Sequence, residues 1–160
     1  MSKKVYLAHP ISTTGEFNDS IRVAKEIESL GYEVYAPALN KEINDKRNNP
    51  TPKMIFEQDL EKLINADIVV LNYTGGDANG TLLELGMLVG GFTELLRETA
   101  QRVCVYTSNQ RALQPQHHNG IPSGKLNHMV LGAIDACGFD WLSTEKEVME
   151  HLKELKEYEE

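Results

Sequence analysis

The chain has 160 residues, of which 41% are hydrophobic, and this suits one globular domain covering residues 1–160. Its formal net charge of −8 argues against a nucleic-acid-binding surface, which needs clustered Lys and Arg to neutralise phosphates. No window is continuously apolar for about eighteen residues, so we expect no membrane segment and a cytoplasmic location. A small, neutral or weakly charged ligand fits this composition better than a nucleic acid.

Short apolar runs followed by turn residues predict the strands of a sheet. The first run stops at His9-Pro10 and the second at Pro37, because proline removes a backbone donor. The predicted strands are Lys4–Ala8, Tyr32–Ala36, Ile68–Leu71, Arg102–Thr107 and Phe139–Leu142.

Helices are predicted between these strands from apolar residues at helical spacing and from capping residues. They cover 21–30, Pro52 to about Ala66, Thr81 onward through Gly90-Gly91 into Ala100, Leu126–Ala136, and a last helix after Thr144. Residues 40–52 and 108–124 are predicted as loops. Alternating strands and helices indicate an α/β fold, because parallel neighbours need crossover connections. We expect a five-stranded parallel sheet in a flavodoxin-like or Rossmann-like three-layer sandwich.

The best candidate for chemistry is Glu84, near the start of the helix that follows the third predicted strand. In open α/β sheets the ligand crevice lies beyond the carboxyl ends of the strands. A carboxylate near a helix N-terminus is favoured in its ionised form, which is the form that nucleophilic attack requires. A glutamate at a helix start is also a common stabilising feature without any catalytic role.

Three further polar residues are candidates for the same site. Asp77 lies in a glycine-rich turn where Asp is ordinary, but if it faces Glu84 their repulsion would provide a proton donor. Asp59 lies in the middle of a predicted helix, where Asp has poor propensity, so it is a candidate for function or a solvated surface residue. His9 is either a base or ligand contact, or simply packed and hydrogen-bonded.

We expect neither a cofactor nor a metal ion. The glycine-rich turn 75–80 lacks the G-x-G-x-x-G spacing of dinucleotide sites, and the chain has no G-x-x-x-x-G-K-[ST] phosphate loop. Cys104 and Cys137 have no Cys or His at metal-ligand spacing and are predicted to be buried free thiols rather than a disulfide. His117-His118 also lack a paired Cys or carboxylate.

Four motifs resemble those of the nucleoside 2-deoxyribosyltransferases, and the resemblance runs from Val5 to about Leu152. They are Tyr6-Leu7-Ala8-His9-Pro10, Asp59, Ala66-Asp67-Ile68-Val69 and the stretch from Asp77 to Gly86, whose specific part is Gly80-Thr81-Leu82-Leu83-Glu84-Leu85-Gly86. An Asn before a Met in a later helix is matched by Asn127-His128-Met129.

The resemblance implies an enzyme that moves 2-deoxyribose between nucleobases, with a deoxynucleoside and a nucleobase as its small-molecule partners. Glu84 would attack C1′ of the deoxyribose, Tyr6 would orient it, and Asp59 and Asp77 would bind or protonate the departing base. Asn127 would reach the neighbouring subunit's site, which makes a homo-oligomer functional. The resemblance also places the following residues against the substrate: Ala8, His9, Pro10, Gly80 and Thr81.

The sequence departs from the family pattern in two places. One extra residue separates Asp77 from Gly80, and the helix after Gly86 is predicted to be longer than in compact members. Two alternatives stay open. A deoxynucleoside 5′-monophosphate N-glycosidase would need phosphate ligands such as Ser12, Ser20 and Arg22. A non-catalytic nucleotide-binding module would have no need for several carboxylates in one crevice.

Overall fold

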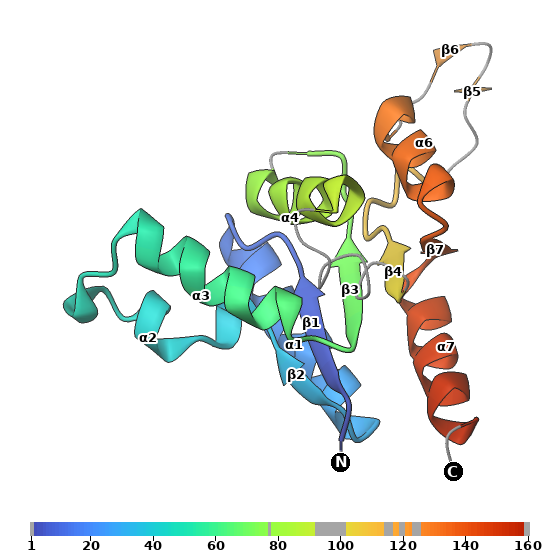
Figure 1. Cartoon of the computed structure of the whole chain (residues 1–160). Coiled ribbons are helices and arrows are strands. Elements are labelled where there is room, and N and C mark those ends of the chain that lie inside the picture. Colours follow the sequence, from blue (N-terminus) through green and yellow to red (C-terminus); the bar gives the residue numbers. More distant parts are fainter. Residues whose placement is uncertain are drawn as a thin grey trace.

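The computed structural model describes residues 2–76, 78–91, 102–113, 117–118, 121–122 and 126–158 (Figure 1). Strands in this part of the chain are short, and the three at 4–8, 68–72 and 103–106 are largely buried. They are β1 (Lys4–Ala8), β2 (Glu33–Tyr35), β3 (Ile68–Asn72), β4 (Val103–Tyr106), β5 (His117–His118), β6 (Ile121–Pro122) and β7 (Asp140–Ser143).

Helices alternate with the strands, and three of them begin at side chains that satisfy free backbone N–H groups. Thr13, Thr51 and Thr144 each accept a hydrogen bond from the first turn of the helix that follows. The α-helices are α1 (Thr14–Ser29), α2 (Lys41–Asn44), α3 (Pro52–Ile64), α4 (Asn79–Gly90), α6 (His128–Ala136) and α7 (Glu145–Glu157), and the 3₁₀ turns are η1 (Pro37–Leu39) and η2 (Lys46–Asn48).

The main sheet has the strand order β2-β1-β3-β4-β7, and every neighbouring pair is parallel. This is the flavodoxin-like order, in which the chain reverses its direction of travel across the sheet between β1 and β3. The predicted five-stranded parallel sheet is therefore confirmed. Ligand crevices of such sheets lie where the loops after these two central strands diverge.

Alternate side chains of the central strands face two separate cores. Tyr6 of β1 packs with Leu63 of α3 and Leu85 of α4 on one face of the sheet. Leu7 packs with Ile27 of α1 and Leu152 of α7 on the other face. Helices α3, α4 and α6 therefore form one outer layer, and helices α1 and α7 form the opposite one (Figure 1).

Several predicted boundaries were wrong, for identifiable reasons. Residues 40–52 are not one long loop, because Asn40 and Asp45 cap the short turns α2 and η2. Helix α4 does not pass through Gly91, whose left-handed φ of 57° ends the helix there. The expected helical continuation over 92–100 lies outside the described residues. The predicted loop 108–124 contains the antiparallel pair β5-β6.

One burial prediction was also wrong. Cys104 is buried as expected, but Cys137 ends α6 at the surface and is exposed, and both are free thiols. Along α4, Leu82 is 42% exposed, because Leu85 and Leu88 occupy the buried side of this helix. No helix in the described ranges is long and apolar enough to cross a lipid bilayer.

Candidate active site

The side chains of Tyr6 and Glu84 meet at the centre of the sheet. The Tyr6 hydroxyl donates a hydrogen bond to Oε1 of Glu84, so the interior of β1 is tied to the second turn of α4. Tyr6 has no exposed surface, whereas Glu84 is only partly buried. A rigid, buried phenol therefore holds the carboxylate of a residue that is only partly buried.

A second tyrosine–carboxylate pair lies beside the first. Tyr35 of β2 is the register partner of Tyr6, and the centroids of the two rings are 5.5 Å apart. The Tyr35 hydroxyl donates to Oδ1 of Asp59 at 2.7 Å and accepts from Nδ2 of Asn40 at 2.9 Å. Four side chains from β1, β2, α3 and α4 thus form one cluster. The two tyrosine rings lie next to each other, and each tyrosine hydroxyl donates to one carboxylate.

Burial dominates the electrostatics of Glu84. Loss of solvation raises the pKa of this carboxyl from 4.5 to about 8, the hydrogen bond from Tyr6 lowers it, and the charge of Asp59 raises it. The sequence predicted that the helix start would favour the ionised form of Glu84. This was wrong, because burial has the larger effect on the pKa and favours the protonated form. Glu84 lies in the second turn of α4, and the helix dipole fades beyond the first turn.

The neighbouring groups are shifted in the same direction. Burial raises the pKa of Asp59, and the hydrogen bond from Tyr35 opposes that rise. Burial also raises the pKa of Tyr6 and Tyr35, and nearby carboxylates add to both shifts. Both phenols therefore keep their protons and act as hydrogen-bond donors to the carboxylates.

The loop after β1 is fixed by a buried histidine. The Asn72 side chain accepts from the backbone of Ser108 through Oδ1, so its Nδ2 donates to Nε2 of His9 at 3.0 Å. Nδ1 of His9 then donates to the carbonyl of Pro10 at 2.8 Å. His9 is 5% exposed, and Ala8 and Pro10 are buried too, so this segment is packed inside the protein at the end of β1.

The start of α4 supplies the remaining residues of the sequence motif. Thr81 is buried, and Gly80 is exposed with open space where a Cβ would stand. Asp77 lies outside the described residues, so its predicted role stays a prediction. The motif residue Asp67 has a structural contact: its Oδ2 accepts from the backbone N–H of Lys4 at 2.7 Å, which links the starts of β1 and β3.

Asn127 stands at the beginning of α6. Its Oδ1 accepts from the backbone N–H groups of Met129 and Val130, and its own N–H donates to the Tyr73 hydroxyl at 3.2 Å. Tyr73 directly follows β3, so Asn127 borders the turn that leads into α4. The predicted contact of Asn127 with a neighbouring subunit stays a prediction.

A pocket of about 560 Å³ borders the cluster on the side of β2 and α3. Tyr35, Asn40 and Gln58 line it together with Leu39 and other residues of these segments. Its walls include neither Tyr6 nor Glu84. The pocket therefore adjoins the candidate site at Tyr35 and Asn40, whose side chains are hydrogen-bonded to each other next to Asp59.

Sequence reasoning missed Tyr35 and Asn40. Tyr35 is the last residue of β2, and Asn40 comes shortly after it. The signal was available, because Tyr35 ends, and Asn40 follows, a strand that precedes a proline, at the edge where ligand crevices form. The interpretation of 40–52 as a featureless loop concealed Asn40.

Comparison with known proteins identifies the family. The model of the family "Nucleoside 2-deoxyribosyltransferase" matches residues 5–132, which covers most of the chain and includes Tyr6, Asp59, Glu84 and Asn127. The chain belongs to the nucleoside 2-deoxyribosyltransferase family. A comparison of this family member with curated protein sequences gives no significant match.

Solved structures share the fold of this deoxyribosyltransferase family member at low identity. A conserved protein from Enterococcus faecalis V583 has a TM-score of 0.74 at 21% identity, covering 96% of this chain and 99% of that one. A 2-deoxyribosyltransferase from Bacillus psychrosaccharolyticus has a TM-score of 0.60 at 19% identity, covering 91% and 90%. A 2-deoxyribosyltransferase from Leishmania mexicana has a TM-score of 0.50 at 12% identity, covering 80% and 85%.

The raised pKa of Glu84 predicts a pH-dependent cost in stability. Between pH 4.5 and about 8 the folded protein keeps a proton on Glu84 that the unfolded chain releases, so the free energy of unfolding falls as the pH rises. Glu84→Gln removes this loss and is expected to exceed the wild type by about 1–3 kcal/mol above pH 8, with little difference near pH 4. Urea unfolding at several pH values measures this.

The matched control is Glu57→Gln, because Glu57 is an exposed glutamate of α3 with a long ion pair to Lys53 at 3.5 Å. Its effect should stay within about 0.5 kcal/mol at every pH. A gain of Glu84→Gln that is the same at pH 4 and pH 9 would contradict the assigned titration.

The hydrogen bond from Tyr6 gives a second expectation for Glu84. Because this bond lowers the pKa of Glu84, Tyr6→Phe should raise the pKa further. Carbon-13 NMR of the labelled glutamate carboxyl groups follows this titration directly. Tyr35→Phe is the control, since Tyr35 donates to Asp59 rather than to Glu84. An unchanged Glu84 midpoint in Tyr6→Phe would show that the hydrogen bond has no electrostatic effect.

Proposed function

We propose that this protein transfers 2-deoxyribose between nucleobases through a covalent intermediate on Glu84. The observation that carries the proposal is the hydrogen bond from the buried Tyr6 hydroxyl of β1 to the carboxylate of the partly buried Glu84, on the helix that follows β3 of the parallel sheet. Membership of the nucleoside 2-deoxyribosyltransferase family supports the substrate class. The general chemistry is that of a retaining glycosidase.

In the first step a Glu84 oxygen attacks C1′ of the deoxynucleoside. The bond from C1′ to the base nitrogen breaks, its electron pair leaves with the base, and a glycosyl ester forms. The nucleophile must be the anion, and the Tyr6 hydrogen bond favours that form against the burial that opposes it. Tyr6 also fixes the direction in which the carboxylate faces the sugar.

Asp59 is the group proposed to contact the departing base. Burial raises the pKa of Asp59, and this favours the protonated form that can donate a proton to a base nitrogen as the glycosidic bond breaks. Tyr35 holds one oxygen of Asp59 and leaves the other for the base. In the second step a nitrogen of a new base attacks C1′ and gives its proton to Asp59. The ester bond to Glu84 breaks, and this restores the Glu84 carboxylate and the protonated Asp59.

The phosphate-dependent alternative has weaker support from the described residues. Ser20 is fully buried in α1 and cannot contact a phosphate. Arg22 is held in ion pairs at 2.7 Å with Asp19 and with Glu145. Of the three phosphate ligands expected from the sequence, Ser20 is buried and Arg22 is held in ion pairs. Ser12 is exposed, so it is the one that these observations leave available to a phosphate.

A pure binding module also fits less well. Two carboxylates, Glu84 and Asp59, share the site, and the charge of Asp59 raises the cost of ionising Glu84. Such a cost is uncommon in a site that only has to hold a neutral ligand, and it is typical of groups that perform acid–base or nucleophilic chemistry.

We further propose a homo-oligomer in which Asn127 approaches a neighbouring site. Apolar side chains on the helices that flank the crevice support this proposal. Leu83 of α4 is 56% exposed and Met129 of α6 is 86% exposed, so a second copy would bury apolar surface that now faces water.

The transferase proposal predicts a specific product pattern. With deoxyinosine and adenine the wild type should form deoxyadenosine as its β anomer, because two displacements at C1′ retain the configuration. Glu84→Gln should lose at least about a hundredfold in turnover, since it preserves the shape of the site and removes the nucleophile. Chromatography of the products, with NMR for the anomer, measures both.

Glu57→Gln is again the matched control and should keep full activity. Incubation with deoxyadenosine 5′-monophosphate separates the alternatives. Free adenine from this substrate, without transfer from deoxyinosine, would favour the phosphate-dependent hydrolase, and binding without either product would favour a sensor. Turnover of Glu84→Gln above about a tenth of the wild type would refute the role of Glu84.

A further inference from the structure

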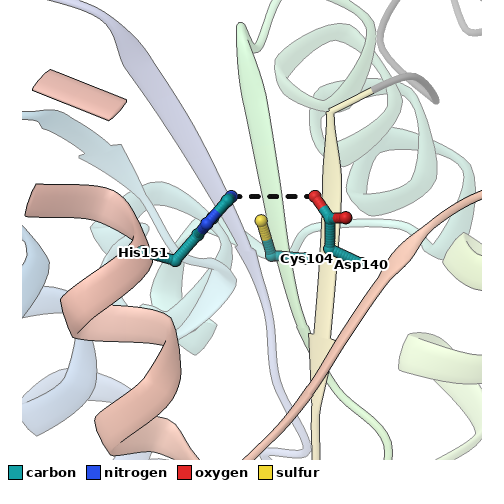
Figure 2. A group of neighbouring side chains, drawn as sticks. All are labelled: Cys104, Asp140 and His151. Carbon is teal, nitrogen blue, oxygen red and sulfur yellow. Dashed lines mark ion pairs between the residues drawn. The ribbon is translucent and has the colours of Figure 1, made fainter. Parts of the chain in front are cut away.

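Three potential metal ligands converge on the face of the sheet opposite the candidate active site. The sulfur of Cys104, a carboxylate oxygen of Asp140 and an imidazole nitrogen of His151 all lie within 4.8 Å of one another. The Nε2 atom of His151 is 3.6 Å from Oδ2 of Asp140. Figure 2 shows the three side chains pointing toward one another from β4, β7 and α7.

The fold brings these residues together although they are far apart in the sequence. Cys104 and Asp140 are register partners on neighbouring parallel strands, so their side chains lie on the same face. His151 comes from α7, whose residues Met149 and Leu152 pack against that face. Sequence spacing gave no reason to expect a metal site, because ligand spacing patterns detect only ligands that are close in the chain.

The three residues differ in how much of their surface is exposed to solvent. Cys104 is 1% exposed, whereas the side chains of His151 and Asp140 are 27% and 53% exposed. A buried sulfur therefore lies beneath two ligands that reach solvent. A metal ion can enter from the side of Asp140 and His151 without unfolding of the core, and water can fill a fourth position.

We propose that Cys104, Asp140 and His151 bind a zinc ion or a similar transition-metal ion. Thiolate, imidazole and carboxylate are the ligand types that zinc takes in proteins, whereas magnesium and calcium prefer oxygen ligands alone. One thiolate and one carboxylate neutralise the double positive charge of the ion. The site differs from the deoxyribosyl-transfer site, because Tyr6 and Cys104 face opposite cores.

The geometry needs only a small adjustment. A tetrahedral zinc ion with ordinary bond lengths holds its nitrogen, oxygen and sulfur ligands roughly 3.3 to 3.6 Å apart. The present separation of Nε2 and Oδ2 is already close to this range. The longest separation must shorten by no more than about 1.3 Å, which rotations of the exposed Asp140 and His151 side chains can provide.

Binding has a defined proton balance. Burial and the charge of Asp140 raise the pKa of the Cys104 thiol to about 12, so the metal-free group is protonated at neutral pH. Zinc replaces this proton when the zinc–sulfur bond forms, and the proton passes to the solvent. Release of the thiol proton is therefore expected when zinc binds.

The test uses the full-length protein titrated with zinc chloride, and separately with cobalt(II) chloride. We expect one saturable zinc site per chain, with release of about one proton, seen by calorimetry in two buffers of different ionisation enthalpy. Cobalt should give a thiolate-to-metal charge-transfer band. Zinc should also raise the melting temperature, because the ion links α7 to the β4–β7 edge.

Matched variants identify the ligands. His151→Gln and Cys104→Ser should each weaken zinc binding at least about tenfold, and Cys104→Ser should abolish the cobalt band. His128→Gln and Cys137→Ser change an exposed histidine and the other thiol, and they should change the affinity by less than about twofold. His151 is a partly exposed residue, so its variant keeps the core and tests the site even where Cys104→Ser folds poorly.

The proposal is overturned by any of three results. The first is a wild type that shows no saturable binding of zinc. The second is a His151→Gln variant that binds zinc as tightly as the wild type. The third is a cobalt band that persists in Cys104→Ser and disappears in Cys137→Ser. Activity is not needed as a readout, because the two sites lie on opposite faces of the sheet.

Discussion

The hydrogen bond from Tyr6 to Glu84 is the constraint on which the candidate site depends. It joins a fully buried residue of β1 to a helix that follows β3, at the point where the order of the strands changes direction. Burial makes the Glu84 anion costly, and the phenol compensates only in part. The protein thus accepts a local loss of stability to hold the Glu84 carboxyl in place, and such a loss is common at functional sites.

Much of the fold follows from patterns that the sequence displays. Continuous apolar runs such as 68–71 identify strands buried on both faces, and Thr51 with Pro52 marks a helix start because local chemistry alone determines a cap. The failures arise where long-range packing decides. Gly91 ends α4 through a left-handed conformation, and the exposure of Cys137 depends on which side of α6 meets the sheet.

The site was partly predictable as well. Glu84, Asp59 and Tyr6 stand in motifs, and the structure brings them into one cluster with Tyr35, which no motif indicated. Its partnership with Asp59 depends on the register of β2 against β1, a long-range property. The pKa of Glu84 was misjudged for the same reason, because the sequence shows a helix start but not how much protein covers a side chain.

The most direct test of the central claim is to look for the covalent intermediate itself. The protein is mixed with deoxyinosine without an acceptor base, quenched in acid, digested and analysed by peptide mass spectrometry. The account predicts that the peptide containing Glu84 gains the mass of one deoxyribosyl group and that Glu84→Gln gains none. A deoxyribosyl group on any other residue would contradict it.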